Sequence, residues 1–456
     1  MHWTEKLFVR DKNFYKAVTK IAIPVVLQAL ISIGVNMTDT LMLGVYGEIQ
    51  LSASSLANEF LNIFMILCFG VGGGAGVLTA QYWGARDIPS LKKIINVMLW
   101  IVLGIAAIFT FFAAWAPDAI MRIYSPEEQL IEKGVLYLRM SAASIPLMGI
   151  TLTLTIVLRS VREVRVPLIA TSIIFLANVF GNWVLIYGNL GAPEMQIEGA
   201  ALSTLLSRII EVMIIGGYFL FADKKIGYRV RDFFTKVSKS QFMLYVKYSV
   251  PVIVSDFFLG FGNSAISIIM GHIGSSFVAA NSIIMQVVRV STVFNQGVSN
   301  ASGIITGNTM GMGEKDKAYR QGWTFLALSV LLGMVAAVLI LVICPLVINL
   351  YDFTPETVGI ARELMFAVAA IAVFQTVEGV MTKGVLRGGG DTRFLMLADV
   401  LFLWIASVPL GYLAGLYFHL PPFWIFAALK IDIVIKAVWC AFRLKSKKWM
   451  REVSVS

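Results

Sequence analysis

Long apolar stretches alternate with short polar segments along almost the whole chain. Each stretch holds about 20 residues or more, which is enough for a helix to cross a hydrocarbon core of about 30 Å. A helix satisfies its backbone hydrogen bonds within one segment, as a membrane requires. The pattern therefore predicts an all-α integral membrane protein with twelve transmembrane helices, at about 17–45, 52–82, 91–115, 130–158, 166–187, 196–222, 240–272, 277–308, 317–350, 358–386, 394–417 and 423–442.

Composition supports this class of protein. Of the 456 residues, 58% are hydrophobic and 14% are charged, and the mean hydropathy is +0.80, whereas about 25% of the residues of a soluble domain are charged. The three cysteines and three histidines are scattered without the spacing of a metal site. We expect no resident cofactor, and no metal other than a Na⁺ ion at Asp39, a residue taken up below.

The net charge of +10 raises the question of a nucleic-acid partner, but the basic residues are sorted by loop. They gather before the first span, in alternate loops, between spans six and seven, and after the last span. The opposite loops hold only Arg122, Lys133 and Arg362. Basic loops stay in the cytoplasm. We therefore expect a multi-pass protein of the cell (inner or plasma) membrane with both termini cytoplasmic, the lipid bilayer as its surroundings and no nucleic-acid partner.

The chain repeats itself. At an offset of 227 residues, Pro24 aligns with Pro251 and Gly47 with Gly274; further on the offset becomes 228, and Arg159 aligns with Arg387. Because six spans is an even number, both halves enter the membrane in the same direction. Parallel repeats of this kind are typical of transporters that bind substrate between their halves. We predict an N-terminal six-helix lobe at 1–222, a cytoplasmic linker at 223–239 and a C-terminal six-helix lobe with a basic tail at 240–456.

Asp39 is the first candidate site residue. It lies in the first span with no Lys or Arg nearby in the sequence, and its repeat equivalent is Ile266. An ionisable group inside a membrane is costly and is a functional candidate by default. A carboxylate there can bind a proton, a small cation or a cationic substrate, and the three compete. The alternative is a structural carboxylate satisfied by Ser or Thr hydroxyls.

Polar residues in the first and fifth spans are further candidates. Asn178 and Asn182 lie four residues apart, hence on one helix face, and their amide oxygens suit a hard cation; a structural hydrogen bond between helices is the alternative. Asn36, one turn before Asp39, either supports the site or packs as its repeat equivalent does. Met37 is a candidate to line an adaptable substrate cavity. Pro24 either bends the first helix during transport or forms a static kink.

The second half carries its own charges within predicted spans. By the direction of their spans they lie towards the cytoplasmic side, and we expect a C-lobe charge network of Asp256, Glu378, Lys383 and Asp399. One interpretation is a structural ion network that holds this half together. The other is a second cation or proton site.

Six segments together resemble the multidrug and toxic compound extrusion (MATE) family over essentially the whole chain. They are VNMTDTLMLG, AQYWGARD, GNTMGMGEKD, LRGGGDTR, IEGAALST and VPLGYLAG. The resemblance implies a twelve-helix, V-shaped antiporter that exports organic cations and other amphiphiles against inward H⁺ or Na⁺ flow. It implies an ion site at Asp39, Asn178 and Asn182, and Thr204 matches a family hydroxyl near that site.

Two departures from the family limit this transfer. Some members have an acid where Asn182 stands, so the site here has one formal charge. Other members carry C-half acids at positions that align with Leu259 and Thr376, so their second sodium site does not carry over. Coupling through Asp39 is therefore the prediction.

Other functions have less support. A flippase for lipid-linked precursors, from the same superfamily, would need several cations to bind a pyrophosphate. An integral-membrane enzyme would need a metal cluster, a nucleophile or paired catalytic carboxylates, and the sequence offers none of these patterns. Duplicated halves favour alternating access over a channel. No ATP-binding motif is present, so an ion gradient must supply the energy. We expect a monomer.

Overall fold

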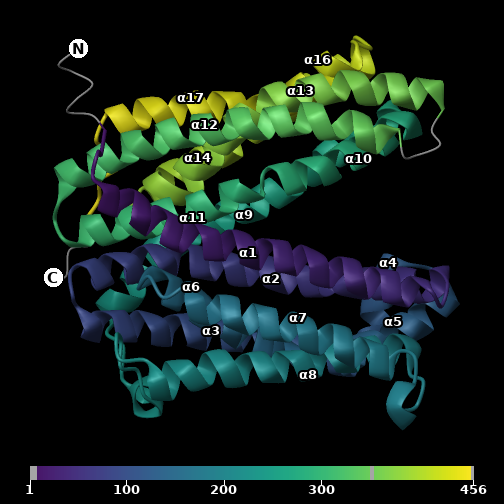
Figure 1. Cartoon of the computed structure of the whole chain (residues 1–456), viewed down its shortest axis with the longest axis horizontal. Helices are drawn as coiled ribbons and strands as arrows, with labels where there is room; N and C mark the ends of the chain where they lie inside the picture. The colour runs from purple at the N-terminus through teal and green to yellow at the C-terminus, as the bar shows by residue number, and fades with distance from the viewer. Residues whose placement is uncertain (1–7, 350–353, 453–456) are drawn as a thin grey trace. The chain divides into compact units, whose positions relative to one another are not determined.

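The structure is a computed structural model that describes residues 8–349 and 354–452. Within these ranges the chain consists of helices and their connections and contains no strand (Figure 1). The prediction of an all-α fold is confirmed.

The described residues of the first half form eight α-helices. They are α1 (Lys12–Gly44), α2 (Glu48–Gly84), α3 (Ile88–Trp115), α4 (Pro117–Tyr124), α5 (Glu128–Ser141), α6 (Ser144–Ser160), α7 (Arg165–Leu185) and α8 (Gln196–Gly217). Three short pieces follow or interrupt them: η2 (Asn189–Gly191), η3 (Tyr218–Ala222) and η4 (Val230–Phe234).

The second half follows the same plan with more irregular helices. Its α-helices are α9 (Lys239–Ile273), α10 (Ser275–Ser291), α11 (Val293–Gly311), α12 (Lys315–Ile348), α13 (Pro355–Val380), α14 (Thr392–Leu401), α15 (Val408–Tyr412), α16 (Pro422–Leu429) and α17 (Ile431–Lys445). Three π-helical pieces continue some of these helices: η5 (Met381–Leu386), η6 (Phe402–Ser407) and η7 (Leu413–Tyr417).

The helices match the predicted spans closely. In the described residues, nine helices are long and apolar enough to cross a membrane, and eleven spans result if two bent pairs each count as one. The pairs are α5 with α6, bent by 54°, and α10 with α11, bent by 49°. The last predicted span, 423–442, is helical as α16 and α17 but falls outside this set. It carries the charged residues Lys430, Asp432 and Lys436.

The helices form two compact units. The N-terminal unit comprises 27–79 and 87–249; the C-terminal unit comprises the residues up to Val26, Ala80–Arg86 and the residues from Val250 on. Three of the four passages between the units lie within helices α1, α2 and α9, and the fourth lies in the connection between α2 and α3. In α1 the passage follows closely after Pro24, and in α9 it lies directly before the equivalent Pro251. The predicted boundaries at 222 and 240 stay a prediction.

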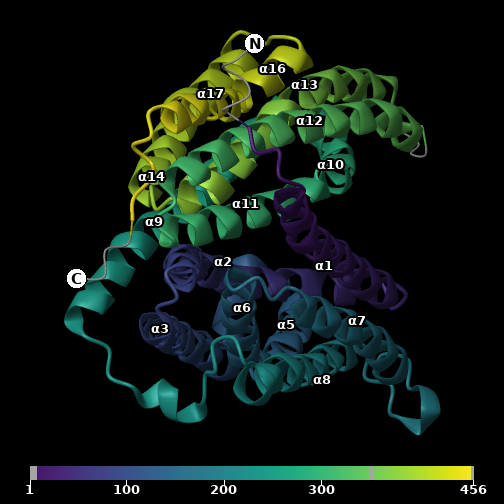
Figure 2. The same cartoon turned by 60° about the vertical axis from the view of Figure 1, so that its left-hand side comes forward.

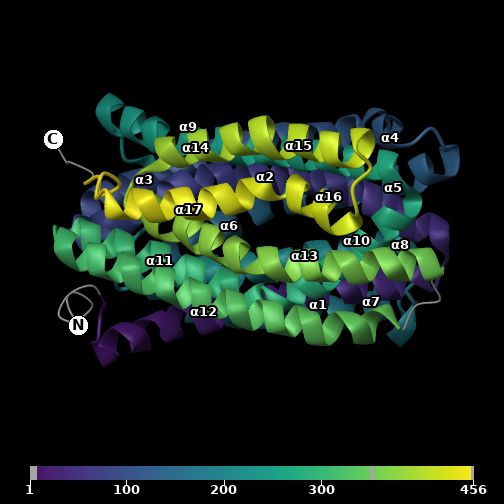
Figure 3. The ribbon, with the colours of Figure 1, turned by 90° about the horizontal axis from the view of Figure 1, so that it is seen from above.

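Small residues allow helices to pack closely in the C-terminal unit. Helices α12 and α13 run side by side (Figure 3). Gly333 of α12 faces Val373 of α13, where an added Cβ would lie 2.7 Å from the Val373 Cα atom. Small residues are the usual means by which helix backbones approach in a membrane.

The same unit contains a close contact between the two repeats. The end of α2 meets the end of α11, and each helix presents a glycine to a carbonyl of the other. A Cβ on Gly84 would lie 2.0 Å from the Asn308 oxygen, and one on Gly311 would lie 1.9 Å from the Gln81 oxygen. The Asn308 side chain also donates to the Ala80 carbonyl at 3.0 Å. Gly84 and Gly311 are repeat equivalents, so the contact is nearly symmetric.

Candidate functional site

The predicted residues Asp39, Asn178 and Asn182 come together in the N-terminal unit. Asp39 lies five residues before the last residue of α1, and both asparagines lie on one face of α7. Asn182 Nδ2 donates to Asp39 Oδ1 at 2.5 Å and to Asn178 Oδ1 at 3.4 Å. Asn182 is fully buried and Asn178 nearly so. The four-residue spacing in the sequence thus produces a polar strip on α7 that faces Asp39.

Helix α8 supports this strip. Asn178 Nδ2 donates to Thr204 Oγ1 at 3.5 Å, and Ser203 Oγ donates to the Asn178 carbonyl at 3.0 Å. The two helices approach at Gly181, where a Cβ would lie 2.5 Å from Ser203 Oγ. Thr204 therefore lies at the edge of the cluster and is connected to Asn182 through the Asn178 amide.

One atom of the cluster lacks a partner. Asn182 Oδ1 is buried and accepts no hydrogen bond within the described residues, although buried polar atoms nearly always have one. The oxygen lies on the amide group that donates to Asp39, so a proton-bearing group or a small cation bound beside the carboxylate would satisfy it. The described residues contain no group of three or more His, Cys, Asp and Glu side chains fit for a metal ion. One carboxylate with neutral oxygens suits a monovalent cation or a proton.

Two charged residues of α8 were not predicted. Arg208 lies one turn after Thr204, and its Nη1 donates to Glu211 Oε2 at 2.7 Å. The positive charge of Arg208 also acts on Asp39, but no hydrogen bond or ion pair joins those two side chains in the part of the chain described. Asp39 thus has a distant cation and no direct basic partner. The signal was an Arg and a Glu three residues apart inside the span predicted at 196–222.

The remaining residues predicted in α1 are Asn36, Met37 and Pro24. Asn36 and Met37 are exposed within the unit, Met37 at 59%. The Asn36 carbonyl accepts a hydrogen bond from Thr40 Oγ1 at 2.8 Å. Pro24 lies within α1, fifteen residues before Asp39. The structure does not join these three side chains to the Asp39 cluster by any hydrogen bond among the described residues.

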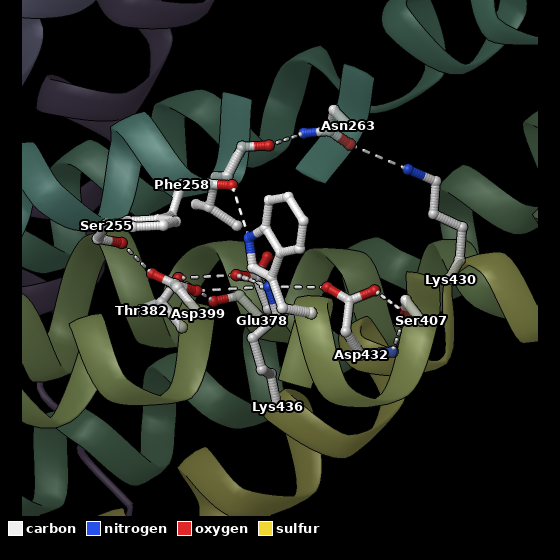
Figure 4. A network of polar contacts seen from close by, with 12 residues as sticks. Ser255, Phe258, Asn263, Glu378, Thr382, Asp399, Ser407, Lys430, Asp432 and Lys436 are labelled. Carbon is white, nitrogen blue, oxygen red and sulfur yellow. Dashed lines mark hydrogen bonds and ion pairs between the residues drawn. The ribbon is translucent and has the colours of Figure 1, made fainter. Parts of the chain in front are cut away.

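The C-terminal unit contains a different arrangement of charges (Figure 4). Lys436 Nζ of α17 lies 3.1 Å from Asp432, 3.4 Å from Asp399 and 3.6 Å from Glu378. The Lys436 side chain is only 4% exposed. Each carboxylate also accepts from a hydroxyl, namely Ser407 for Asp432, Ser255 for Asp399 and Thr382 for Glu378.

This network contains half of the residues predicted for it. Glu378 and Asp399 are members. Asp256 is half-buried and Lys383 is exposed, and no hydrogen bond or ion pair connects either to Lys436 or its partners in residues 8–349 and 354–452. The central residue, Lys436, and the third acid, Asp432, were missed. Their positions in the last apolar stretch of the sequence were the available signal.

Comparisons with known proteins agree with the duplication and the fold. The MatE family model matches residues 24–184 and 251–413, so each half matches once. A probable multidrug resistance protein NorM from Thermotoga maritima is 25% identical over 438 residues, 95% of this chain and 93% of that protein. One of the same name from Mesorhizobium japonicum is 28% identical, over 96% and 93%.

A solved structure resembles the whole chain. The crystal structure of a MATE protein in the bent conformation has a TM-score of 0.86 at 18% identity, and the match covers 95% of this chain and 96% of that one. At this identity the likeness shows a shared fold.

Proposed function

The chain belongs to the MatE family of membrane transporters, and we propose that it is a secondary active antiporter that exports organic cations or amphiphilic drugs in exchange for H⁺ or Na⁺. Both NorM relatives are named probable multidrug resistance proteins and align along nearly their full length. That supports small apolar or cationic compounds as the substrates.

The observation that carries the proposal is the state of Asp39. Its direct partner among the described residues is a neutral amide, Asn182, and the other atom of that amide is unsatisfied. A carboxylate within a membrane span and without a paired cation is costly. Binding a proton, a Na⁺ ion or a cationic substrate removes that cost, and because all three need the same oxygens they exclude one another. Mutual exclusion at one site is what an exchange reaction requires.

The oxygen set defines how the driving ion would bind. Asp39 would supply the charge and Asn182 Oδ1 a neutral oxygen. Asn178 accepts from the Asn182 amide and in turn donates to Thr204, which fixes the orientation of both amides. Na⁺ would add neutral oxygens to the carboxylate, whereas H⁺ would need only the carboxylate. Asn36 and Met37, exposed on α1 next to Asp39, would contact the substrate.

Transport would proceed by alternating access of the two units, with both termini in the cytoplasm and the protein acting as a monomer in the cell membrane. Helices α1, α2 and α9 each belong to both units, so a change in one unit is transmitted through helix backbone. Pro24 and Pro251 lie beside two of these passages and remove a helix hydrogen bond there.

Proteoliposomes that export a cationic dye test the proposal. An inward H⁺ gradient and an inward Na⁺ gradient are imposed separately, and the one that drives efflux identifies the ion. Asp39→Asn should abolish gradient-driven efflux while the protein keeps its melting temperature. Asp11→Asn, an exposed acid just before α1, is the matched control and should transport normally. Normal efflux by Asp39→Asn would refute coupling at this site.

A further inference from the structure

The segment 223–238, which connects η3 to α9 and is called the linker segment below, has a fixed conformation. Asp223 is fully buried, and its carboxylate accepts backbone N–H groups of Lys225, Ile226 and Gly227 at 2.9 to 3.2 Å. This arrangement closes a tight turn at the start of the segment. The linker segment is therefore a folded part of the N-terminal unit.

The middle of the linker segment, η4, is hydrogen-bonded to side chains of α3; Figure 2 shows the backbone of the segment, in teal, leading from the end of α8 to α9. Lys92 Nζ donates to Asp232 Oδ2 at 2.8 Å and to the Gly227 carbonyl at 2.7 Å. Asn96 Nδ2 donates to the Asp232 carbonyl at 2.6 Å. Lys92 and Asn96 lie one helical turn apart on α3, so these contacts follow the helix along its axis.

The highest contact on α3 is aromatic. The ring of Phe233 meets the ring of Trp100 edge to face, with centroids 6.2 Å apart. Trp100 lies eight residues beyond Lys92, or about 12 Å along the helix axis. Helix α3 is one of the nine helices apolar enough to cross a membrane, and Lys92 and Lys93 mark its polar end. The linker segment thus extends along the part of α3 that enters the lipid.

The outer face of the linker segment is both apolar and basic. Val230 is 58% and Phe234 is 75% exposed. Arg231 and Lys236 are exposed, and their side chains form no hydrogen bond or ion pair within the described residues. The two acids of the segment are used internally, Asp223 by the turn and Asp232 by Lys92. The exposed charge is therefore positive.

We propose that the linker segment is a membrane-surface anchor, in which Val230 and Phe234 enter the boundary between headgroups and acyl chains while Arg231 and Lys236 bind the phosphates of anionic phospholipids. The lipid leaflet is the partner because α3, to which η4 is fastened, must itself lie in lipid at that level. Interfacial segments typically bury their apolar face about 5–10 Å into this boundary. In the proposed topology this leaflet is the cytoplasmic one, but the anchor does not depend on antiport.

A depth measurement tests the apolar half of the anchor. Spin labels are placed at Phe234→Cys and, as a control, at Ser238→Cys, in a background where Cys68, Cys344 and Cys440 are replaced by alanine. In lipid nanodiscs, we expect the label at 234 to collide more with oxygen than with a water-soluble nickel complex, and the label at 238 to show the reverse. Equal access of the nickel complex to both labels would overturn the proposal.

A lipid-binding measurement tests the basic half. Arg231→Gln/Lys236→Gln should lower the retention of phosphatidylglycerol by the purified protein, measured by native mass spectrometry, by about fivefold for each charge removed. Retention of phosphatidylcholine should not change. The matched control, Lys133→Gln/Arg362→Gln, removes two positive charges outside the linker segment, one from α5 and one from α13. An equal loss in the control, or no loss in the test variant, would contradict the assignment.

Discussion

Each unit of this protein places acids within its apolar helices, but among the described residues Asp39 has no ion-pair partner, whereas the acids around Lys436 do. In the N-terminal unit, Asp39 is held by Asn182, and the charge of Arg208 is directed to Glu211. In the C-terminal unit, three carboxylates surround Lys436 within 3.6 Å. A carboxylate that is hydrogen-bonded to a neutral amide can bind and release a proton or a cation. A carboxylate paired with the ammonium group of Lys436 is already neutralised by a cation that cannot leave. We therefore assign the first arrangement to coupling and the second to stability.

The largest expected effect is the loss of the central lysine. Lys436→Met should lower the free energy of unfolding by about 3–5 kcal/mol, because breaking a buried ion pair leaves uncompensated charge. The measurement is denaturant unfolding in detergent. Asp399→Asn, added to Lys436→Met, should restore part of the loss by removing one of the orphaned charges. If Lys436→Met keeps the stability of the wild type, the assignment of the C-terminal network to stability is contradicted.

Next in size is the effect of Asn182→Ala. We expect the concentration of driving ion at half-maximal efflux to rise about 10–100-fold, as is usual when a residue that orients a metal ligand is lost. Asn178→Ala should have a smaller effect, because Asn178 is connected to Asp39 only through Asn182. Efflux assays over a range of Na⁺ concentration or pH give both values. If the order of the two variants were reversed, Asn182 would have no direct part in the ion site.

Glu378→Gln should have a modest effect. Glu378 is the acid furthest from Lys436 Nζ, at 3.6 Å, and two carboxylates remain beside the lysine when it is neutralised. We expect efflux to be retained and the melting temperature to change by a few degrees at most. Loss of efflux at unchanged stability would instead identify a second cation or proton site in the C-terminal unit, and the two units would then not differ in function.

The smallest effect concerns an ion pair outside the membrane spans, Lys92 with Asp232. Burial alone would raise the pKa of Asp232, but the hydrogen bonds from Lys92 and from the Arg229 backbone, with nearby positive charge, hold that pKa below its usual range. Because the pKa is depressed, the stabilisation is present above the unfolded value of 3.8 and is lost as the pH falls through the folded pKa.

Asp232→Asn should therefore destabilise the protein at pH 7 by less than about 1 kcal/mol, and the difference from wild type should vanish in strong acid. Thermal unfolding at a series of pH values measures this. A difference that persists at the lowest pH would mean that the side chain acts through its shape rather than its charge.

Sequence alone predicted the spans and singled out Asp39, because both depend on local rules, whereas the grouping of Asn178 and Asn182 with Asp39 rested on the family resemblance. Apolar length defines a span, and a four-residue spacing puts Asn178 and Asn182 on one face. That Asn182 rather than a hydroxyl holds Asp39 depends on how α1 packs against α7, which no spacing encodes. Sequence spacing likewise does not determine that Arg208 pairs with Glu211 rather than with Asp39, because this depends on side-chain geometry.

The C-terminal network was predicted only in part, also for a physical reason. Membership depends on which helix faces meet, and π-helical turns in η5 and η6 shift those faces away from ideal periodicity. Asp256 and Lys383 have suitable charges at a suitable depth, but no ion pair joins them to Lys436 in the part of the chain described. Lys436 itself was hidden in a stretch whose average hydropathy suggested an ordinary span.

The contact of Gly84 with Asn308 and of Gly311 with Gln81 has a consequence for how the two repeats could diverge. Where backbone meets backbone with less than 3 Å for a side chain, neither copy tolerates any other residue, whichever task its half performs. Elsewhere the two repeats differ, as at Asp39 and its equivalent Ile266. The duplication is therefore preserved where the helices cross and lost at the position that carries a charge in one half only.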